Sequence, residues 1–236
     1  MKKMYGLGAF YMLEGIDIDK LYYDRKSGNK FCVLNKCNIV IGDNEIVGLM
    51  GSSGCGKSTL ARVLLRLIDC DGGIVRFGGI DITKLSNSKL LTFRKNVQFV
   101  SQRPENFFDP MLKLRTSILE PLKIFGLNYR NEMIEDVLES VKLNIKILER
   151  YPHQISGGEV QRLSIARALF LQPKILILDE PTSMLDISVQ AQVLHILKDI
   201  QKERNLSYLF ISHDSEVINW ISDRVIVMKN GNIVSV

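Results

Sequence analysis

The sequence lacks the long apolar run that a membrane-spanning helix needs, and it also lacks an export signal. No stretch in its 236 residues approaches the roughly 18 consecutive apolar residues of a transmembrane span. The N-terminal residues Met1, Lys2 and Lys3 are not followed by an apolar stretch that ends in a small-residue cleavage site. We therefore expect a chain that stays in the cytoplasm and meets the membrane only through partners.

Cysteine is scarce and does not have the spacing of a metal site. The four cysteines form no Cys-x-x-Cys pair, so a zinc site is not indicated, and reduced thiols are expected in a cytosolic protein. The sequence also has no internal repeat, no low-complexity linker and no long heptad-bearing segment. These absences exclude repeat arrays and extended coiled coils, and they favour a globular chain.

The composition is that of a globular protein with a sizeable core. Hydrophobic residues make up 46% and charged residues 24% of the chain. The net charge of +5 is compatible with nucleic acid or anionic lipid, but the basic residues are scattered through the sequence rather than clustered. We interpret the excess as suited to phosphate ligands and a nearby membrane surface, and we expect no nucleic-acid partner.

A glycine-rich segment between an apolar strand and a helix is the strongest motif. The strand is expected over residues 45–50, and the helix carries one apolar stripe at Leu60, Val63, Leu64, Leu67 and Ile68. This strand-loop-helix setting is what a phosphate-binding P-loop requires, whereas an ordinary glycine-rich turn needs no Lys-Ser pair at its end. The candidate phosphate ligands are Gly51, Ser52, Ser53, Gly54, Cys55, Gly56, Lys57, Ser58 and Thr59.

Each residue type in this loop has a physical role toward phosphate. Glycines let successive backbone N–H groups converge on the phosphates, and the helix N-terminus adds a partial positive charge. Lys57 is expected to reach the β- and γ-phosphates, and the Ser58 hydroxyl is placed to bind Mg²⁺. The loop therefore predicts ATP and Mg²⁺ as cofactors.

A second motif is the apolar run at residues 174–180, which ends in two carboxylates. An apolar β-rich run of this length is typical of a strand buried on both faces. If its acidic end emerges beside the phosphates, Asp179 holds Mg²⁺ through water and Glu180 orients and deprotonates the attacking water. Taken alone, the same pattern is also that of an ordinary strand end before the turn at Pro181.

The third motif is the serine-glycine-glycine-glutamate segment at residues 156–159. Ser156 with Glu159 forms a capping box, and Ile155 with Val160 occupies the positions of a hydrophobic staple, so a helix start is well specified. Two glycines in a first helical turn cost about 1 kcal/mol each relative to alanine. They are useful if bare backbone must approach an anion; the alternative is a capped helix with a loose start. The anion-binding hypothesis names Ser156, Gly157 and Gly158.

In the order and spacing of these motifs, the chain resembles the ATP-binding subunit of an ATP-binding-cassette (ABC) transporter, from about Leu13 to the C-terminus. The resemblance implies an α/β P-loop NTPase with a mixed, largely parallel core sheet and an N-terminal antiparallel β subdomain. It also implies a single ABC ATPase domain over residues 1–236 with a helical subdomain inserted at 104–171. The residues themselves agree: the chain is strand-rich up to about residue 100, with strands near 30–41 and 73–77, and helical at 131–141.

The resemblance also assigns roles to further residues. Gln102 resembles the Q-loop glutamine that touches Mg²⁺ and the attacking water, and the segment at 183–186 resembles the D-loop, with Asp186 near nucleotide. His213 resembles the switch histidine near the γ-phosphate. The expected catalytic residues are Glu180, His213, Lys57 and Gln102, and the metal site is Ser58, Gln102 and Asp179.

The resemblance implies a set of partners and a location. In this family the serine-glycine-glycine helix of one subunit closes on ATP held by the P-loop of a second ATPase subunit. We therefore expect a homo- or heterodimer beneath two transmembrane permease subunits, at the cytoplasmic face of the membrane, and an extracytoplasmic substrate-binding protein acting indirectly. The alternative is a soluble, non-transport ABC ATPase acting on ribosomes or DNA. Such proteins usually carry two cassettes or long heptad segments, which this sequence lacks.

Residues 179–194, 151–154 and 108–110 are similar to the branch of the family that imports peptides or nickel. Peptide-transporting members commonly carry a C-terminal extension, so the end of the chain at residue 236 leans toward the nickel-type members or a partner-specific variant. The adjacent residues Phe107 and Phe108 either pack under the helical lobe or form a groove for a short helix of a membrane subunit.

Three positions depart from the family pattern. Ile155 and Glu159 stand where Leu and Gln are usual, and Glu159 adds negative charge at a helix start that should face phosphate. The place of the adenine-stacking aromatic is taken by Arg25, so Tyr23 is the candidate for stacking on adenine and Arg25 its alternative.

Overall fold

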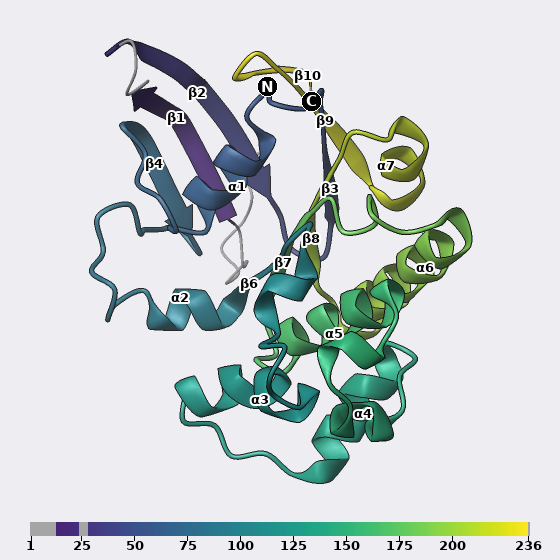
Figure 1. Cartoon of the computed structure of the whole chain (residues 1–236). Coiled ribbons are helices and arrows are strands. Elements are labelled where there is room, and N and C mark those ends of the chain that lie inside the picture. Colours follow the sequence, from purple (N-terminus) through teal and green to yellow (C-terminus); the bar gives the residue numbers. More distant parts are fainter. Residues whose placement is uncertain (1–12, 24–27, 236) are drawn as a thin grey trace.

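The computed structural model describes residues 13–23 and 28–235, and within them the chain forms two sheets flanked by helices (Figure 1). The first sheet is antiparallel, with strand order β2-β1-β4-β5. Its strands are β1 (Leu13–Tyr23), β2 (Lys30–Ile41), β4 (Gly72–Phe77) and β5 (Ile80–Asp81). The strands expected near 30–41 and 73–77 are thereby confirmed, and both belong to this sheet.

The second sheet is the core of the molecule, with strand order β10-β9-β3-β8-β7-β6. The five strands from β9 to β6 run parallel, and β10 is antiparallel to β9. The bounds are β3 (Ile46–Met50), β6 (Val97–Val100), β7 (Ile175–Asp179), β8 (Ser207–Ser212), β9 (Arg224–Lys229) and β10 (Asn232–Ser235). Every residue of β7 and β8 is buried, as continuous apolar runs in a covered parallel sheet require.

Alternate residues of the core sheet belong to two different hydrophobic clusters. Leu176 and Phe210 pack with the helical half of the chain, whereas Ile177 and Leu209 pack with α1 and the antiparallel sheet. Because side chains in a strand alternate between faces, each face of the sheet has its own cover. Figure 1 shows this division, with α1 and the antiparallel sheet on one side and α5 and α6 on the other.

The helix after the glycine-rich segment, α1 (Lys57–Leu64), is shorter than the apolar stripe predicted. Leu65 caps its C-terminus, and Arg66 has a positive φ of 53°, which an α-helix does not tolerate. Of the two last positions of the stripe, Leu67 is exposed and Ile68 only packs at the edge of a cluster. The stripe prediction was therefore wrong beyond Leu64, because the chain leaves the helix before the apolar spacing ends.

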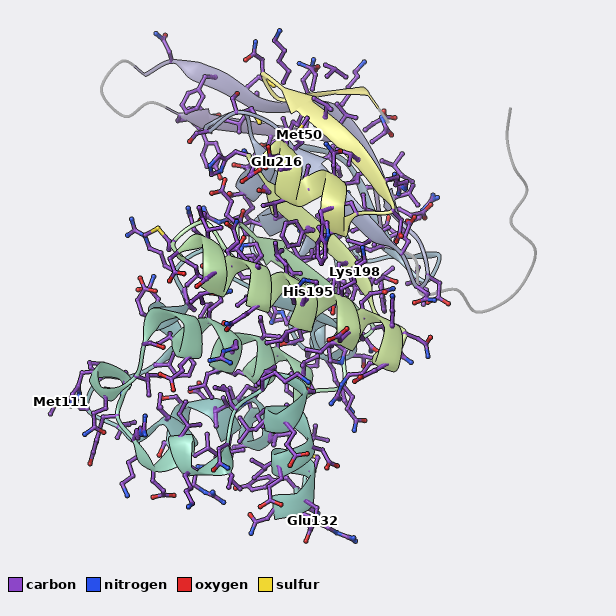
Figure 2. The ribbon with its side chains drawn as sticks, turned by 90° about the vertical axis from the view of Figure 1, so that its right-hand side faces the viewer. Met50, Met111, Glu132, His195, Lys198 and Glu216 are labelled. Carbon is purple, nitrogen blue, oxygen red and sulfur yellow. The ribbon has the colours of Figure 1, made fainter. Side chains whose placement is uncertain are left out.

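The remaining helices lie mostly between β6 and β8. They are α2 (Leu91–Asn96), η1 (Pro104–Phe107), α3 (Leu114–Ile124), α4 (Asn131–Ser140), η2 (Ile145–Glu149), η3 (Pro152–Gln154), α5 (Gly157–Leu169), α6 (Ile187–Arg204) and α7 (Ser215–Ile221). Residues 104–171 hold only helices and turns, and the helix expected at 131–141 is α4. Figure 2 shows Met50, at the end of β3, well separated from Met111 and Glu132 in this helical part. The assignment of 104–171 as an inserted subdomain stays a prediction.

Candidate functional site

The P-loop begins where β3 ends and wraps around the first turn of α1. Gly54 and Gly56 have φ of 78° and 113°, conformations that a residue with a Cβ rarely adopts. At Gly51 the reason for glycine is space, because a Cβ there would lie 2.4 Å from the Met228 carbonyl oxygen. No side chain caps α1, and its first turn has no acidic residue. The first backbone N–H groups of the helix are therefore free of a competing carboxylate.

Lys57 is the first residue of α1 and is almost fully buried. Its Nζ atom donates hydrogen bonds to the carbonyl oxygens of Gly51 and Ser52, at 2.7 and 3.0 Å. The ammonium group thus lies against the P-loop backbone, bound to the carbonyl oxygens of its first two residues. A buried ammonium held only by carbonyl dipoles has no carboxylate partner, and an anion can supply the compensating charge.

Ser58 and Asp179 meet although 121 residues separate them. The Ser58 Oγ atom donates a hydrogen bond to Oδ1 of Asp179 at 3.1 Å, from the second residue of α1 to the last residue of β7. Burial raises the pKa of the Asp179 carboxyl above its usual range, and the Ser58 hydrogen bond and the nearby cations of Arg62 and Lys57 oppose this shift. A hydroxyl beside a buried carboxylate is a pair of oxygen ligands of the kind that Mg²⁺ prefers.

Glu180 lies at the centre of a polar cluster just beyond β7. Its Oε1 atom lies 3.1 Å from Nδ1 of His213, and its Oε2 atom accepts a hydrogen bond from Nε2 of Gln102 at 3.2 Å. Gln102 Nε2 also lies 3.3 Å from the Ser183 hydroxyl. Glu180 has a positive φ of 48°, held by a hydrogen bond from its backbone N–H to the Ile211 carbonyl. Strain of this kind at a non-glycine residue is typical of functional sites.

These residues surround a cavity of about 200 Å³. It is lined by Val33, Ser53, Gly54, Gly56, Lys57, Ser58, Thr59, Gln102 and Glu180. The structure therefore brings together the P-loop, the Q-loop glutamine and the predicted base. Val33 was missed by sequence reasoning, since it comes from β2 in the antiparallel sheet and no local pattern marks it.

This cavity does not identify the residue that stacks on adenine. Tyr23 ends β1, is 64% exposed and does not line the cavity; the Lys30 ammonium lies 5.1 Å from the centre of its ring. Arg25, its alternative, lies outside the described residues. The role of Tyr23 stays a prediction.

The serine-glycine-glycine segment begins α5, as predicted, with the complete capping box. The Ser156 backbone N–H and hydroxyl donate to Oε2 of Glu159 at 2.8 and 2.9 Å, and Ser156 Oγ lies 3.3 Å from the Glu159 backbone nitrogen. The hydrogen bond from the Ser156 backbone holds the pKa of the Glu159 carboxyl below its usual range. Glu159 is therefore ionised at neutral pH.

The two glycines of this segment have different reasons to be glycine. A Cβ at Gly158 would lie 2.5 Å from Cγ1 of Val189 in α6, whereas a Cβ at Gly157 would meet nothing within 4 Å. Packing against α6 is therefore a second reason for glycine at position 158, and the hypothesis that both glycines approach an anion stays a prediction. At Gly157 no packing contact accounts for the glycine.

Asp186 has a structural function in this chain. Its Oδ1 atom accepts hydrogen bonds from the backbone N–H groups of Ser188 and Val189, at 3.1 and 3.0 Å, and so caps α6. The carboxylate is thereby committed to the helix start, and a contact of Asp186 with nucleotide stays a prediction.

Phe107 and Phe108 have features of both roles considered for them, packing under the helical part and lining a groove. Phe108 is buried in the cluster of the helical half, and Phe107 lies half-buried under the Arg167 guanidinium, 5.6 Å from it. Both also line a broad surface cavity of about 670 Å³. Its other lining residues are Asn106, Asp109, Pro110, Leu112, Thr116, Ser117, Glu120 and Lys123.

Comparison with known proteins decides the family. The family model described as "ABC transporter" matches residues 34–183, which span the P-loop, the Q-loop, the serine-glycine-glycine segment and the Asp-Glu strand. The chain belongs to the ABC transporter family. The resemblance inferred from its motifs is thereby confirmed, and as an ABC ATPase it is a nucleotide-hydrolysing enzyme.

Curated relatives of this ABC protein are named as transport or import proteins. It is 40% identical over 92% of its length to the oligopeptide transport ATP-binding protein OppF of Streptococcus mutans, of which it covers 71%. It is 42% identical over 94% of its length to AppF of Bacillus subtilis, also named an oligopeptide transport ATP-binding protein, of which it covers 70%. The glutathione import ATP-binding protein GsiA of Escherichia coli is 43% identical over 86% of this chain, which covers 33% of GsiA.

The fold of this ABC protein matches that of solved cassettes. The dimeric bacterial ABC transporter cassette MJ0796 superposes with a TM-score of 0.83 at 27% identity, over 94% of this chain and 96% of that one. The same cassette in a post-hydrolysis state with ADP and phosphate gives the same TM-score. The predicted fold class, an ABC-type P-loop NTPase, is confirmed. None of the helices that the structure describes has the length and hydropathy of a transmembrane span.

Proposed function

We propose that this chain binds and hydrolyses ATP to power an ABC importer whose cargo is short peptides. The observation that supports it most strongly is a cavity lined by Lys57, Ser58 and Glu180, with the buried Asp179 carboxylate hydrogen-bonded to Ser58. That cavity holds a phosphate cradle, a set of oxygen ligands and a general base, which are the parts that phosphoryl transfer to water needs. The relatives named for peptide transport supply the link to import.

The donor set fits Mg²⁺. Ser58 Oγ and Asp179 Oδ1 already lie within hydrogen-bonding distance of each other, and the side-chain oxygen of Gln102 is available near the same cavity. When bound, Mg²⁺ neutralises charge on the β- and γ-phosphate oxygens. Asp179 is the buried carboxylate that would hold it, and Ser58 orients that carboxylate from α1.

Glu180 is the residue proposed to take the proton from the attacking water. His213 and Gln102 each contact one of its two oxygens, so the carboxylate is oriented from both sides. Lys57 stabilises the negative charge that spreads over the transferred group, because its ammonium already lies in the P-loop. His213 holds the geometry of Glu180 and of the γ-phosphate.

A second ATPase subunit completes the site in this proposal. Ser156 and Gly157 do not line the phosphate cavity of their own chain, and Figure 1 shows the start of α5 apart from α1. At Gly157 a side chain would meet nothing within 4 Å, so packing does not explain why this residue is glycine and its backbone is open to a ligand. A head-to-tail dimer, homo- or heteromeric, would put Ser156, Gly157 and Gly158 of one copy over ATP in the other, and the solved MJ0796 cassette, which shares this fold, is dimeric.

Two transmembrane permease subunits are the proposed membrane partners. The broad cavity beside Phe107 and Phe108 has aromatic, apolar and charged lining residues, which suit a short helix of a permease. This would place the chain at the cytoplasmic face of the membrane, with the extracytoplasmic substrate-binding protein reached only through the permeases. Closure over ATP and reopening after hydrolysis then change the access of the permeases by differential binding energy.

The cargo is proposed from the relatives. OppF and AppF are named for oligopeptides and GsiA for glutathione, and this favours peptides over nickel complexes. Action on ribosomes or DNA has no support among these names.

The test is reconstitution. The chain is expressed with the permeases and substrate-binding protein encoded beside it, purified as a complex and placed in proteoliposomes. We expect ATP-dependent uptake of a labelled tetrapeptide and none of ⁶³Ni²⁺. Uptake of nickel alone would replace the peptide assignment, and co-purification with ribosomes or DNA instead of permeases would overturn the importer assignment.

A further inference from the structure

A second cavity lies beside the phosphate site, between α5 and the turn that follows β7. Its volume is about 290 Å³, and it shares only Gln102 with the phosphate cavity. Three segments far apart in the sequence enclose it: the Q-loop with η1, the start of α5, and residues 181–185. The lining residues are Gln102, Pro104, Glu105, Ile155, Gly157, Val160, Gln161, Pro181, Met184 and Leu185.

One polar side chain in this cavity has no partner. Gln161, in the second turn of α5, is only 3% exposed, and its Nε2 atom makes no hydrogen bond within the described part of the chain. A buried donor left unpaired costs about 1–3 kcal/mol. Such a cost is unusual at a well-packed helix, and because the Nε2 atom is itself covered, an acceptor in the cavity relieves it only when the Gln161 amide turns toward the cavity.

The other lining residues restrict what that group can be. Ile155, Val160 and Leu185, with Pro181 and Met184, make an apolar wall that suits a branched aliphatic body. None of the lining residues is cationic, and Glu105 is an exposed carboxylate, so an anion is disfavoured and an ammonium group is favoured at that side. These features disfavour free phosphate and nucleotide as occupants.

The size of the cavity is also selective. A volume of about 290 Å³ lies at the lower end of ordinary ligand pockets, which start near 300 Å³. Water next to an apolar wall is readily displaced by an apolar group that also satisfies the polar atom present.

We propose that this cavity, called here the Gln161 cavity, binds the N-terminal end of a short peptide or an amino-acid amide with a branched apolar side chain. The side chain lies against Val160 and Leu185, the Gln161 amide turns into the cavity to donate a hydrogen bond to the first carbonyl oxygen, and the ammonium group lies toward Glu105. No covalent step is involved.

Occupancy of the Gln161 cavity acts on ATP hydrolysis. The ligand touches both α5, which carries Ser156 and Gly157, and the turn at 181–185, which follows Glu180. It therefore stabilises the arrangement in which these segments enclose the cavity, and it opposes any movement of α5 that closes the ATP site. If the importer carries peptides, as the proposed function holds, accumulated cargo would slow its own uptake.

Binding is tested first, on the full-length chain without nucleotide. Leucinamide is titrated into protein labelled with ¹⁵N-glutamine, and the side-chain amide signal of Gln161 is assigned by its loss in Gln161→Met. We expect this signal to shift and saturate with leucinamide. Isoamylamine, which lacks the carbonyl, and leucine, which adds a carboxylate, should bind at least tenfold more weakly.

Two variants make the test specific. Glu105→Gln, at an exposed position, should weaken leucinamide binding several-fold and leave N-acetyl-leucinamide, which has no ammonium group, unchanged. Val160→Phe should abolish binding of both by filling the cavity, and it serves as the second test if Gln161→Met proves misfolded by circular dichroism. A shift that never saturates, meaning binding at high probe concentration only, would overturn the proposal, as would equal affinity for isoamylamine.

The regulatory consequence is tested by ATP turnover. Leucinamide should lower the turnover of the wild-type chain at the concentrations that saturate the Gln161 signal, and it should leave Val160→Phe unaffected relative to that variant's own baseline. Saturable binding with unchanged turnover would refute regulation. These measurements need neither permease nor cargo, so failure of peptide uptake in proteoliposomes would count against the proposed function alone.

Discussion

His213 Nδ1 lies 3.1 Å from Oε1 of Glu180, while the other carboxylate oxygen accepts a hydrogen bond from Gln102. Both oxygens of the base are therefore engaged before nucleotide arrives. The positive φ of Glu180 and the hydrogen bond from its backbone to Ile211 hold the residue in this position. Such preorganisation lowers the cost of orienting the carboxylate during reaction.

Replacing Glu180 by glutamine tests its role as base. Glu180→Gln keeps the size of the side chain and the contact with Gln102 but cannot take a proton. We expect phosphate release to fall about 10²- to 10⁴-fold while ATP binding is retained. Gel filtration with ATP should then show a stable dimer. Glu203→Gln, an exposed change in α6, is the matched control; hydrolysis in Glu180→Gln equal to that of this control would refute the assignment.

The two glycines of α5 separate packing from ligand binding. Gly158→Ala brings a Cβ against Val189, so we expect a loss of about 1–3 kcal/mol in the free energy of unfolding. Shortening the neighbour in Gly158→Ala/Val189→Ala should restore much of it. Gly157→Ala meets open space and favours the helix by about 1 kcal/mol, so its melting temperature should not fall.

Gly157→Ala should instead impair the ATP-bound dimer. Its Cβ would stand between the backbone and the partner's nucleotide, and we expect dimerisation in the Glu180→Gln background to weaken at least tenfold. Sedimentation at several protein concentrations measures this. A dimer as tight as that of the parent would mean that the start of α5 does not face nucleotide.

Asp179→Asn should stabilise the nucleotide-free chain in a pH-dependent way. Burial raises the pKa of Asp179 in the folded state, so the unfolded chain ionises first as the pH rises through its ordinary value of 3.8. The free energy of unfolding contributed by this group therefore falls between that pH and the raised pKa, and stays low above it. Asparagine has no such loss and can still accept from Ser58.

The increase in melting temperature caused by Asp179→Asn should thus be larger at pH 7 than at pH 4. The exposed change Asp199→Asn, in α6, serves as the control. A gain of equal size at both pH values would contradict a burial effect on the carboxyl. The same variant should lose the additional stabilisation that Mg²⁺ adds to ATP, because the buried carboxylate proposed to hold the metal is gone.

Glu159→Gln should strengthen closure. Glutamine can still accept from the Ser156 backbone, but it removes a carboxylate whose lowered pKa keeps it ionised beside the segment proposed to meet the partner's phosphates. Across about 4–6 Å in a water-like medium this repulsion is near 1 kcal/mol. We expect ATP-dependent dimerisation of the Glu180→Gln protein to tighten about threefold to tenfold, with less effect at high salt.

The exposed change Glu139→Gln, in α4, removes the same charge elsewhere on the helical part and should have no effect. If Glu159→Gln left the dimer affinity unchanged at low salt, or weakened it, the charge of Glu159 would not oppose closure. The capping box would then be its only function.

Features that depend on residues close together in the sequence could be predicted from the sequence. The P-loop, the Asp-Glu strand and the Ser156–Glu159 capping box depend on neighbours a few residues apart, so the pattern of side chains determines their local geometry. The same holds for the family, because the order and spacing of these motifs are themselves a sequence property.

Contacts between distant segments were decided only by the tertiary structure. Gly158 must be glycine because Val189 of α6 packs on it, and three separate segments enclose the Gln161 cavity. Val33 reaches the phosphate cavity from the antiparallel sheet. In each case the atoms that meet lie far apart in the chain, and only close packing of the folded core brings them together.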